Sequence, residues 1–212
     1  MNFARARYLA VVCCCFVGVI TAHAGGDLRT LRDASETDRF ASGAWEIEDV
    51  VGAFFLFDRG GNERVSIDYA LNSFRFGAML YNPHGPGFLR GNVEALGEIF
   101  AGPIFNGPGT AVAGITGFLR YNFVQPGAWV VPYFQGGGGG VYTDITAEES
   151  SRAISLPVEF NLQAVAGLKF LVNRHWSFMT ELGYRHISNA SIHKPNYGVD
   201  QLGGNLGVAF SF

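Results

Sequence analysis

The chain is 212 residues long, 48% hydrophobic and 14% aromatic, with 29 glycines, 19 phenylalanines and a formal net charge of −3. An acidic balance of this kind argues against nucleic acid as a partner. The cysteines are Cys13, Cys14 and Cys15, so the rest of the chain offers no disulfide framework, thiol nucleophile or cysteine metal site.

The first 24 residues have the pattern of a secretory signal peptide. Arg5 and Arg7 give a basic start, an apolar stretch runs from Tyr8 to Ile20, and Ala22-His23-Ala24 has the small residues of a cleavage site. The apolar stretch is too short for a comfortable membrane-spanning helix, which needs about 20 residues. We therefore expect cleavage after Ala24. The 15 basic residues, less Arg5 and Arg7, then leave 13 against 18 acidic ones, a net charge of −5.

Residues 25–43 are polar and charged without a clear period, and we expect a mobile periplasmic lead-in or a short helix there. Residues 44–212 then contain eight strand-like segments, separated by breaks rich in Gly, Pro, Asn and Asp. Each segment is long enough to cross a bilayer as a β-strand, which takes about 9–11 residues. The predicted segments are 44–58, 64–82, 87–105, 109–124, 127–145, 154–171, 174–189 and 199–212.

Alternation within these segments indicates a barrel wall, because successive side chains of a strand point to opposite faces. In segment 154–171, apolar side chains from Val158 to Phe170 share one face, and the other face is polar. The polar side chains are Glu159, Asn161, Gln163 and Lys169. An apolar outside and a polar inside suit a transmembrane β-barrel. A soluble, lipocalin-like barrel would reverse the two faces, so alternation alone leaves both arrangements open.

The last segment favours the membrane barrel over the soluble one. Leu206, Val208, Phe210 and the terminal Phe212 fall on one face. An alternating C-terminal strand that ends in Phe resembles the assembly signal of bacterial outer-membrane barrels. We therefore expect barrel assembly machinery and outer-membrane lipids among the partners. The predicted fold class is all-β: an eight-stranded antiparallel transmembrane β-barrel in the bacterial outer membrane.

An even number of strands, with the N-terminus in the periplasm, assigns each connection to one side of the membrane. The breaks near 59–63, 106–109, 146–153 and 189–198 are then extracellular, and those near 83–86, 125–127 and 172–175 are periplasmic turns. A barrel of eight strands has no room for an open channel. We therefore expect the inward charged side chains to form a structural polar plug. They are Glu94, Glu98, Arg120, Glu159, Lys169, Glu181 and Arg185.

A group of candidate catalytic residues lies where the last two segments meet. His186, Ser188 and Asp200 share the lipid-facing parity of their strands. Ionisable side chains on that face are costly at hydrocarbon depth and suggest function. A serine hydroxyl becomes a strong nucleophile when a histidine takes its proton and a carboxylate orients the imidazole. Residue types and parity thus predict a nucleophile, a base and an orienter; the alternative is ordinary polar residues at a strand end.

The segment from His186 to Asp200 resembles the signature of the PagL-type lipid A 3-O-deacylases, which are eight-stranded outer-membrane barrels. The shared pattern is His-x-Ser-Asn-Ala, then a Pro-Asn pair, then an acidic residue at the start of the final strand. The resemblance implies that Ser188 is the nucleophile, that His186 is the general base and acid, and that Asp200 orients the imidazole.

The same resemblance implies that Asn196 supplies an oxyanion-hole donor, assisted by a backbone N–H near Ser191. Asn189 belongs to the signature, but its parity points inward, so we expect it to shape the loop rather than take part in the chemistry. The sequence departs from the family pattern at two of these positions. Asp200 stands where Glu is common, and Ser191 stands where Gly is usual.

The function implied by the resemblance is a serine esterase that hydrolyses the 3-O-linked hydroxyacyl ester of lipid A, with lipopolysaccharide as substrate, an active site toward the outer leaflet and no cofactor. No metal site is expected, because the histidines are scattered and the mature chain lacks cysteines. Two alternatives remain: a non-enzymatic barrel with a structural or adhesive role, and a lipid acyltransferase or phospholipase with the same nucleophile. A homodimer is also left open.

Overall fold

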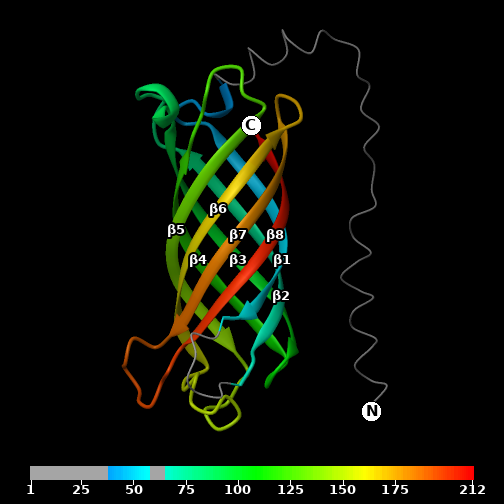
Figure 1. Ribbon diagram of the computed structural model, residues 1–212, viewed down its shortest axis with the longest axis vertical. Helices are drawn as coiled ribbons and strands as arrows, with labels where there is room; N and C mark the ends of the chain where they lie inside the picture. The colour runs from blue at the N-terminus through cyan, green and yellow to red at the C-terminus, as the bar shows by residue number, and fades with distance from the viewer. Residues whose placement is uncertain (1–37, 58–64) are drawn as a thin grey trace, which may run out of the picture.

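Alternating strands and intervening turns build the chain into a closed β-barrel (Figure 1). The computed structural model describes residues 38–57 and 65–212. Neighbouring strands pair antiparallel in sequence order, and β1 closes the barrel by pairing with β8. The predicted eight-stranded all-β barrel is thereby confirmed. The strands are β1 (Trp45–Leu56), β2 (Asp68–Met79), β3 (Asn92–Asn106), β4 (Ala111–Asn122), β5 (Val130–Thr143), β6 (Val158–Leu171), β7 (Trp176–Ser188) and β8 (Val199–Ser211).

Most strands are a few residues shorter than the segments predicted from the sequence. The clearest difference concerns segment 87–105, because Gly87–Leu89 form a short 3-10 turn, η2, and β3 begins only at Asn92. Pro86 has no backbone N–H to donate to a ladder, and Gly85 has a φ of 113°, which suits a turn. The predicted signal peptide, residues 1–24, lies outside the described residues, as do most of the lead-in and the break at 59–63.

Along the strands, one row of side chains faces the lumen and the alternate row faces outward. β7 follows this pattern over most of its length. Its inward row includes the buried Glu181 and Arg185, whereas its outward row includes Leu182, which is 75% exposed. Large exposed apolar side chains on the outer face are what a lipid-facing wall requires. Separately, no helix among the described residues is long and apolar enough to cross a membrane.

Buried ion pairs cross the lumen. Arg75 on β2 bonds Glu98 on β3 (Nε to Oε1, 3.0 Å) and Glu181 on β7 (Nη1 to Oε1, 2.7 Å). Arg120 on β4 donates from Nη2 to Glu48 Oε2 on β1 at 2.9 Å. Buried charges are tolerated only when they are paired and hydrogen-bonded. The polar plug therefore links strands that are not neighbours in the wall, β2 to β7 and β4 to β1.

The barrel end formed by connections 144–157 and 189–198 is here named the loop rim, and it lies at the lower end of Figure 1. Ile154 of the first connection is buried in an apolar cluster with Ile187 and Val199, the residues that flank the second connection. The β5–β6 connection therefore folds inward and supports the ends of β7 and β8.

The opposite end, here named the terminal rim, is closed by the first described residues. Phe40 is fully buried and packs with Met79, and Arg39 Nη1 donates to Ser177 Oγ at 2.8 Å. These residues belong to the segment for which the sequence predicts a mobile lead-in or a short helix. In the described part, residues 38–43, Asp38 and Arg39 are helical, and Arg39 and Phe40 pack into the barrel end.

Candidate active site

The pairing of β7 with β8 brings the candidate catalytic residues together. His186 lies directly opposite Asp200 in this antiparallel ladder. Directly opposed residues have Cβ atoms about 4.5–5.5 Å apart, and residues two apart on one strand share a face. Ser188, two positions beyond His186 at the end of β7, therefore projects on the same face as the imidazole.

One imidazole joins the other two side chains. His186 Nδ1 lies 2.8 Å from Asp200 Oδ1, and His186 Nε2 lies 2.9 Å from Ser188 Oγ. An ionised carboxylate can only accept, so Nδ1 carries the proton in the neutral imidazole and Nε2 accepts from the serine hydroxyl. This is the tautomer that a general base needs in order to take a proton from serine.

These three groups lie on the outer face of the barrel, near the loop rim. The His186 and Asp200 side chains are 31% and 13% exposed, whereas the neighbours of opposite parity, Arg185 and Gln201, are buried in the lumen. The outward row of β7 continues from His186 to Leu182. An arrangement of this kind directs the Ser188 hydroxyl sideways, toward the surroundings of the barrel wall.

Tyr184 is a further member of this group, and the predicted set of His186, Ser188 and Asp200 does not include it. Its hydroxyl donates a hydrogen bond to Asp200 Oδ1, the same oxygen that accepts from His186 Nδ1. A usable signal was present in the sequence, because Tyr184 precedes His186 by two residues on a strand and so shares its face.

Asn196, the predicted oxyanion donor, is turned toward the barrel interior. Its Oδ1 accepts from the Asn189 backbone N–H at 3.2 Å, and its Nδ2 donates to Glu159 Oε1 at 2.7 Å. Nδ2 also lies 3.3 Å from Ala153 O and from Ser155 Oγ. The Asn196 side chain therefore lies beside the backbone N–H that follows Ser188, and its amide donates to the buried Glu159 carboxylate.

Asn189 is buried and points inward, on the side that its parity predicts. Its Nδ2 donates to Ser155 Oγ at 2.7 Å and to His193 O at 2.8 Å. After Asn189 the chain makes a tight turn, closed by the Ile192 N–H to Asn189 O at 3.1 Å. Asn189 therefore holds the start of the loop against the β5–β6 connection.

The two central residues of that turn are left-handed. Ala190 has a φ of 52° and Ser191 a φ of 66°. Positive φ at both central positions is the geometry of a primed turn, which glycine adopts without a steric cost. This explains physically why glycine is usual in the family at the position of Ser191. Strain of this kind is often found beside functional groups.

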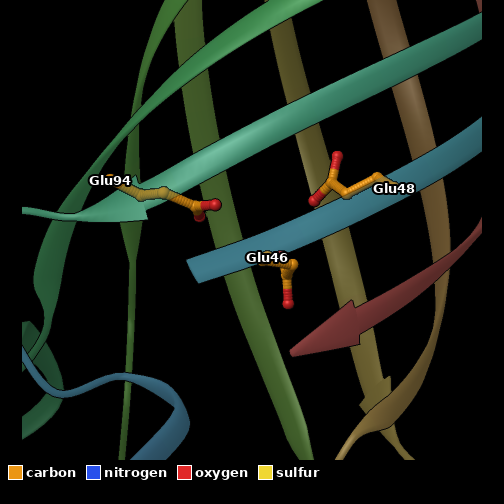
Figure 2. Close-up of side chains that lie close together, drawn as sticks. All are labelled: Glu46, Glu48 and Glu94. Carbon is orange, nitrogen blue, oxygen red and sulfur yellow. The ribbon is translucent and has the colours of Figure 1, made fainter. Parts of the chain in front are cut away.

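Inside the barrel, Glu46, Glu48 and Glu94 bring carboxylates within 4.8 Å of one another (Figure 2). Sequence spacing does not reveal this group, because Glu94 lies on a different strand from the other two. Carboxylates can bind a hard cation. Here, however, Arg120 contacts Glu48 and Glu94, and Lys169 contacts Glu46. Arg75 Nη1 also lies 3.4 Å from Glu48 Oε2. Because three fixed cations contact these three acids, we interpret the cluster as part of the structural plug.

Comparison with known proteins gives one family and a set of related folds. The family model described as "Lipid A 3-O-deacylase (PagL)" matches residues 64–209. The crystal structure of the outer-membrane enzyme PagL is similar at a TM-score of 0.51 and 15% identity, covering 76% of this chain and 97% of that one. Neisserial surface protein A is similar at 0.54 and 13% identity, covering 81% and 100%. A comparison with curated protein sequences gives no match.

Proposed function

Because the chain belongs to the lipid A 3-O-deacylase (PagL) family, we propose that it is a serine esterase of the bacterial outer membrane. Its substrate is lipopolysaccharide, and it hydrolyses the hydroxyacyl ester at position 3 of lipid A. The observation that supports this most strongly is the single imidazole of His186, bonded on one side to Asp200 and on the other to Ser188. No cofactor takes part in this chemistry.

The reaction begins with Ser188. Its Oγ attacks the ester carbonyl carbon while His186 Nε2 takes the hydroxyl proton, and the Asp200 carboxylate stabilises the imidazolium that forms. The tetrahedral intermediate then collapses: the bond between this carbon and the oxygen at position 3 of lipid A breaks, and His186 returns the proton to that oxygen. Water next attacks the acyl-serine with His186 again as base, which releases the 3-hydroxy fatty acid and regenerates Ser188.

The oxyanion of each tetrahedral intermediate needs positioned donors, which contribute about 3–4 kcal/mol in related chemistry. We assign this task to the Asn196 side chain and a backbone N–H near Ser191. In the present arrangement the Asn196 amide donates to Glu159. The proposed contact therefore requires this side chain to turn outward when substrate binds.

The location of the site suits a lipid substrate. His186 and Ser188 project from the outer face, and the outward row of the same strand continues along the apolar Leu182. In the proposed orientation the loop rim faces outward from the cell, so lipid A of the outer leaflet reaches Ser188 by lateral diffusion. Acyl chains then lie along the apolar wall while the ester meets the nucleophile.

The test is expression of the chain in cells with defined lipopolysaccharide, followed by mass spectrometry of extracted lipid A. Wild type should remove one hydroxyacyl mass, and Ser188→Ala should leave lipid A intact. Ser42→Ala, which changes an exposed serine at the terminal rim, is the matched control and should behave as wild type. Intact lipid A with the assembled wild-type barrel would favour a non-enzymatic role, and transfer of the acyl chain to another lipid would indicate an acyltransferase.

A further inference from the structure

We propose that Tyr184 is a positioning residue for this reaction: its hydroxyl holds the Asp200 carboxylate so that one oxygen stays directed at His186. The inference rests on the proposed function, and it adds to it a fourth residue, which precedes the His-x-Ser-Asn-Ala motif. Tyr184, Asp200, His186 and Ser188 then form a continuous hydrogen-bonded series on the outer wall.

The strand register explains how Tyr184 reaches the carboxylate. Tyr184 lies opposite Leu202, and His186 lies opposite Asp200, so Tyr184 and Asp200 are diagonal neighbours on one face. Diagonal neighbours are within reach of aromatic side chains. The phenol spans this distance and donates to Asp200 Oδ1, at which His186 Nδ1 also lies 2.8 Å away.

A second donor on this oxygen has a mechanical consequence. A carboxylate can rotate about its Cβ–Cγ bond and exchange one oxygen for the other. Donors from two directions oppose that rotation and keep Oδ1 on the Nδ1 side of His186. The tautomer with an unprotonated Nε2 is then maintained until Ser188 attacks the ester.

The Asp200 carboxylate is largely shielded from water, so a hydrogen bond from Tyr184 contributes to its stabilisation. The Asp200 side chain is only 13% exposed, and it stands on the face that also carries the outward Leu202, which is 45% exposed. Removal of a carboxylate from water is unfavourable unless hydrogen bonds replace its hydration. Tyr184 supplies one such bond as a neutral donor, so the net negative charge of Asp200 stays available to stabilise the imidazolium.

A different role for Tyr184 would be purely structural. Tyrosine is common at membrane interfaces, where its ring lies in the apolar region and its hydroxyl stays polar. An interfacial anchor would contribute to barrel stability whether or not Asp200 carries a carboxylate. The two roles are therefore separated by asking whether the effect of the Tyr184 hydroxyl depends on Asp200.

The experiment measures the rate at which a fluorophosphonate probe modifies Ser188 in the purified, folded barrel, read by mass spectrometry of the intact chain. This rate reports the activation of the nucleophile without needing lipid A as substrate. The variants are Tyr184→Phe, Asp200→Ala and the double mutant, which together form a double-mutant cycle. Tyr121→Phe is the matched control. It removes a phenol that donates to the Leu89 carbonyl at the terminal rim, the barrel end opposite the candidate site.

We expect Tyr184→Phe to slow modification of Ser188 by about tenfold, as for loss of a hydrogen bond to a charged group. In the Asp200→Ala background the same change should have less than about a twofold effect, because the carboxylate through which it acts is gone. Tyr121→Phe should react as wild type does. If Asp200→Ala does not fold, Asp200→Asn replaces it as the background, with a smaller effect of Tyr184→Phe again expected.

Two results would overturn the inference: a Tyr184→Phe rate equal to wild type, or an equal slowing with and without Asp200. Failure of the proposed function appears differently, as a wild-type barrel whose Ser188 reacts with the probe but which leaves lipid A intact. In that case the cycle still decides the role of Tyr184. A wild-type Ser188 that does not react with the probe at all would contradict both.

Discussion

Asp200 occupies the position where the family commonly has Glu, and the ladder register shows how the shorter side chain suffices. Because Asp200 is directly opposite His186, its carboxylate reaches Nδ1 at 2.8 Å without a further methylene. A longer side chain at the same position would have to fold back to make this bond. The departure from the family pattern is thus compatible with the triad geometry at the scale of the individual residue.

Substitution of this carboxylate tests its role. Asp200→Asn removes the charge that holds the proton on Nδ1, so the wrong tautomer of His186 becomes available, and we expect lipid A hydrolysis to fall by about 10³-fold or more. Asp200→Glu keeps the charge and should retain activity within about tenfold. Rates are measured with purified protein in detergent micelles. Near wild-type hydrolysis by Asp200→Asn would argue against an orienting carboxylate.

Ser191 makes a separate prediction about stability. Its φ of 66° places an L-residue in the left-handed region, which costs roughly 1–2 kcal/mol relative to glycine. Ser191→Gly should therefore raise the free energy of unfolding by up to about 1 kcal/mol, since greater freedom of the unfolded chain offsets part of the gain. Urea unfolding of the refolded barrel measures this. Ser191→Ala keeps the strain and is the control; an equal gain there would contradict the explanation.

At the scale of elements, the loop that follows Ser188 is held by the neighbouring connection. The Tyr197 and Gly198 N–H groups donate to the carbonyls of Arg152 and Ala153, at 3.1 and 3.0 Å. At the same rim, Glu159 Oε1 accepts hydrogen bonds from Asn196 Nδ2 and from the Ser155 and Leu156 N–H groups. One buried carboxylate thus organises both connections of the loop rim.

This arrangement predicts the effect of changing that carboxylate. Glu159→Gln replaces a charged acceptor with a neutral amide, which weakens these hydrogen bonds. We expect amide hydrogen exchange in residues 189–198 to accelerate by about tenfold or more, while exchange in the barrel strands stays the same. Glu148→Gln, at an exposed position of the β5–β6 connection, is the control. Equal protection of residues 189–198 in both variants would show that Glu159 does not organise the loop.

At the scale of the whole molecule, the sequence predicts the number of strands and the apolar outer face of the wall. It also predicts that His186, Ser188 and Asp200 share that face, because the alternation of side chains is a local property of each strand. The lumen pairing could not be predicted in detail. Arg75 bonds Glu181 across 106 positions of sequence, and such a pair depends on the closure and register of the whole barrel. The hydrogen bond from Asn196 to Glu159 could not be predicted for the same reason, since Glu159 lies on β6.

The luminal plug has a testable energetic role. Arg120→Met would remove the cation that contacts the buried Glu94, whereas Glu48 would keep Arg75 at 3.4 Å and Lys169 at 3.7 Å. An uncompensated buried charge costs about 3–5 kcal/mol, and we expect the free energy of unfolding to fall by that amount. Urea unfolding in lipid vesicles measures it, with the exposed Arg174→Met as a control that should change little. An unchanged midpoint for Arg120→Met would mean that the plug does not stabilise the barrel.

The central claim is that Ser188, activated by His186 and Asp200 on the outer wall, hydrolyses an ester of lipid A. The most direct measurement incubates purified barrel with lipid A in micelles made in ¹⁸O-water and analyses both products by mass spectrometry. We predict lipid A shortened by one hydroxyacyl chain and a 3-hydroxy fatty acid that carries ¹⁸O in its carboxylate, with neither product from Ser188→Ala. Intact lipid A with the wild-type barrel, or equal hydrolysis by Ser188→Ala, would contradict the claim.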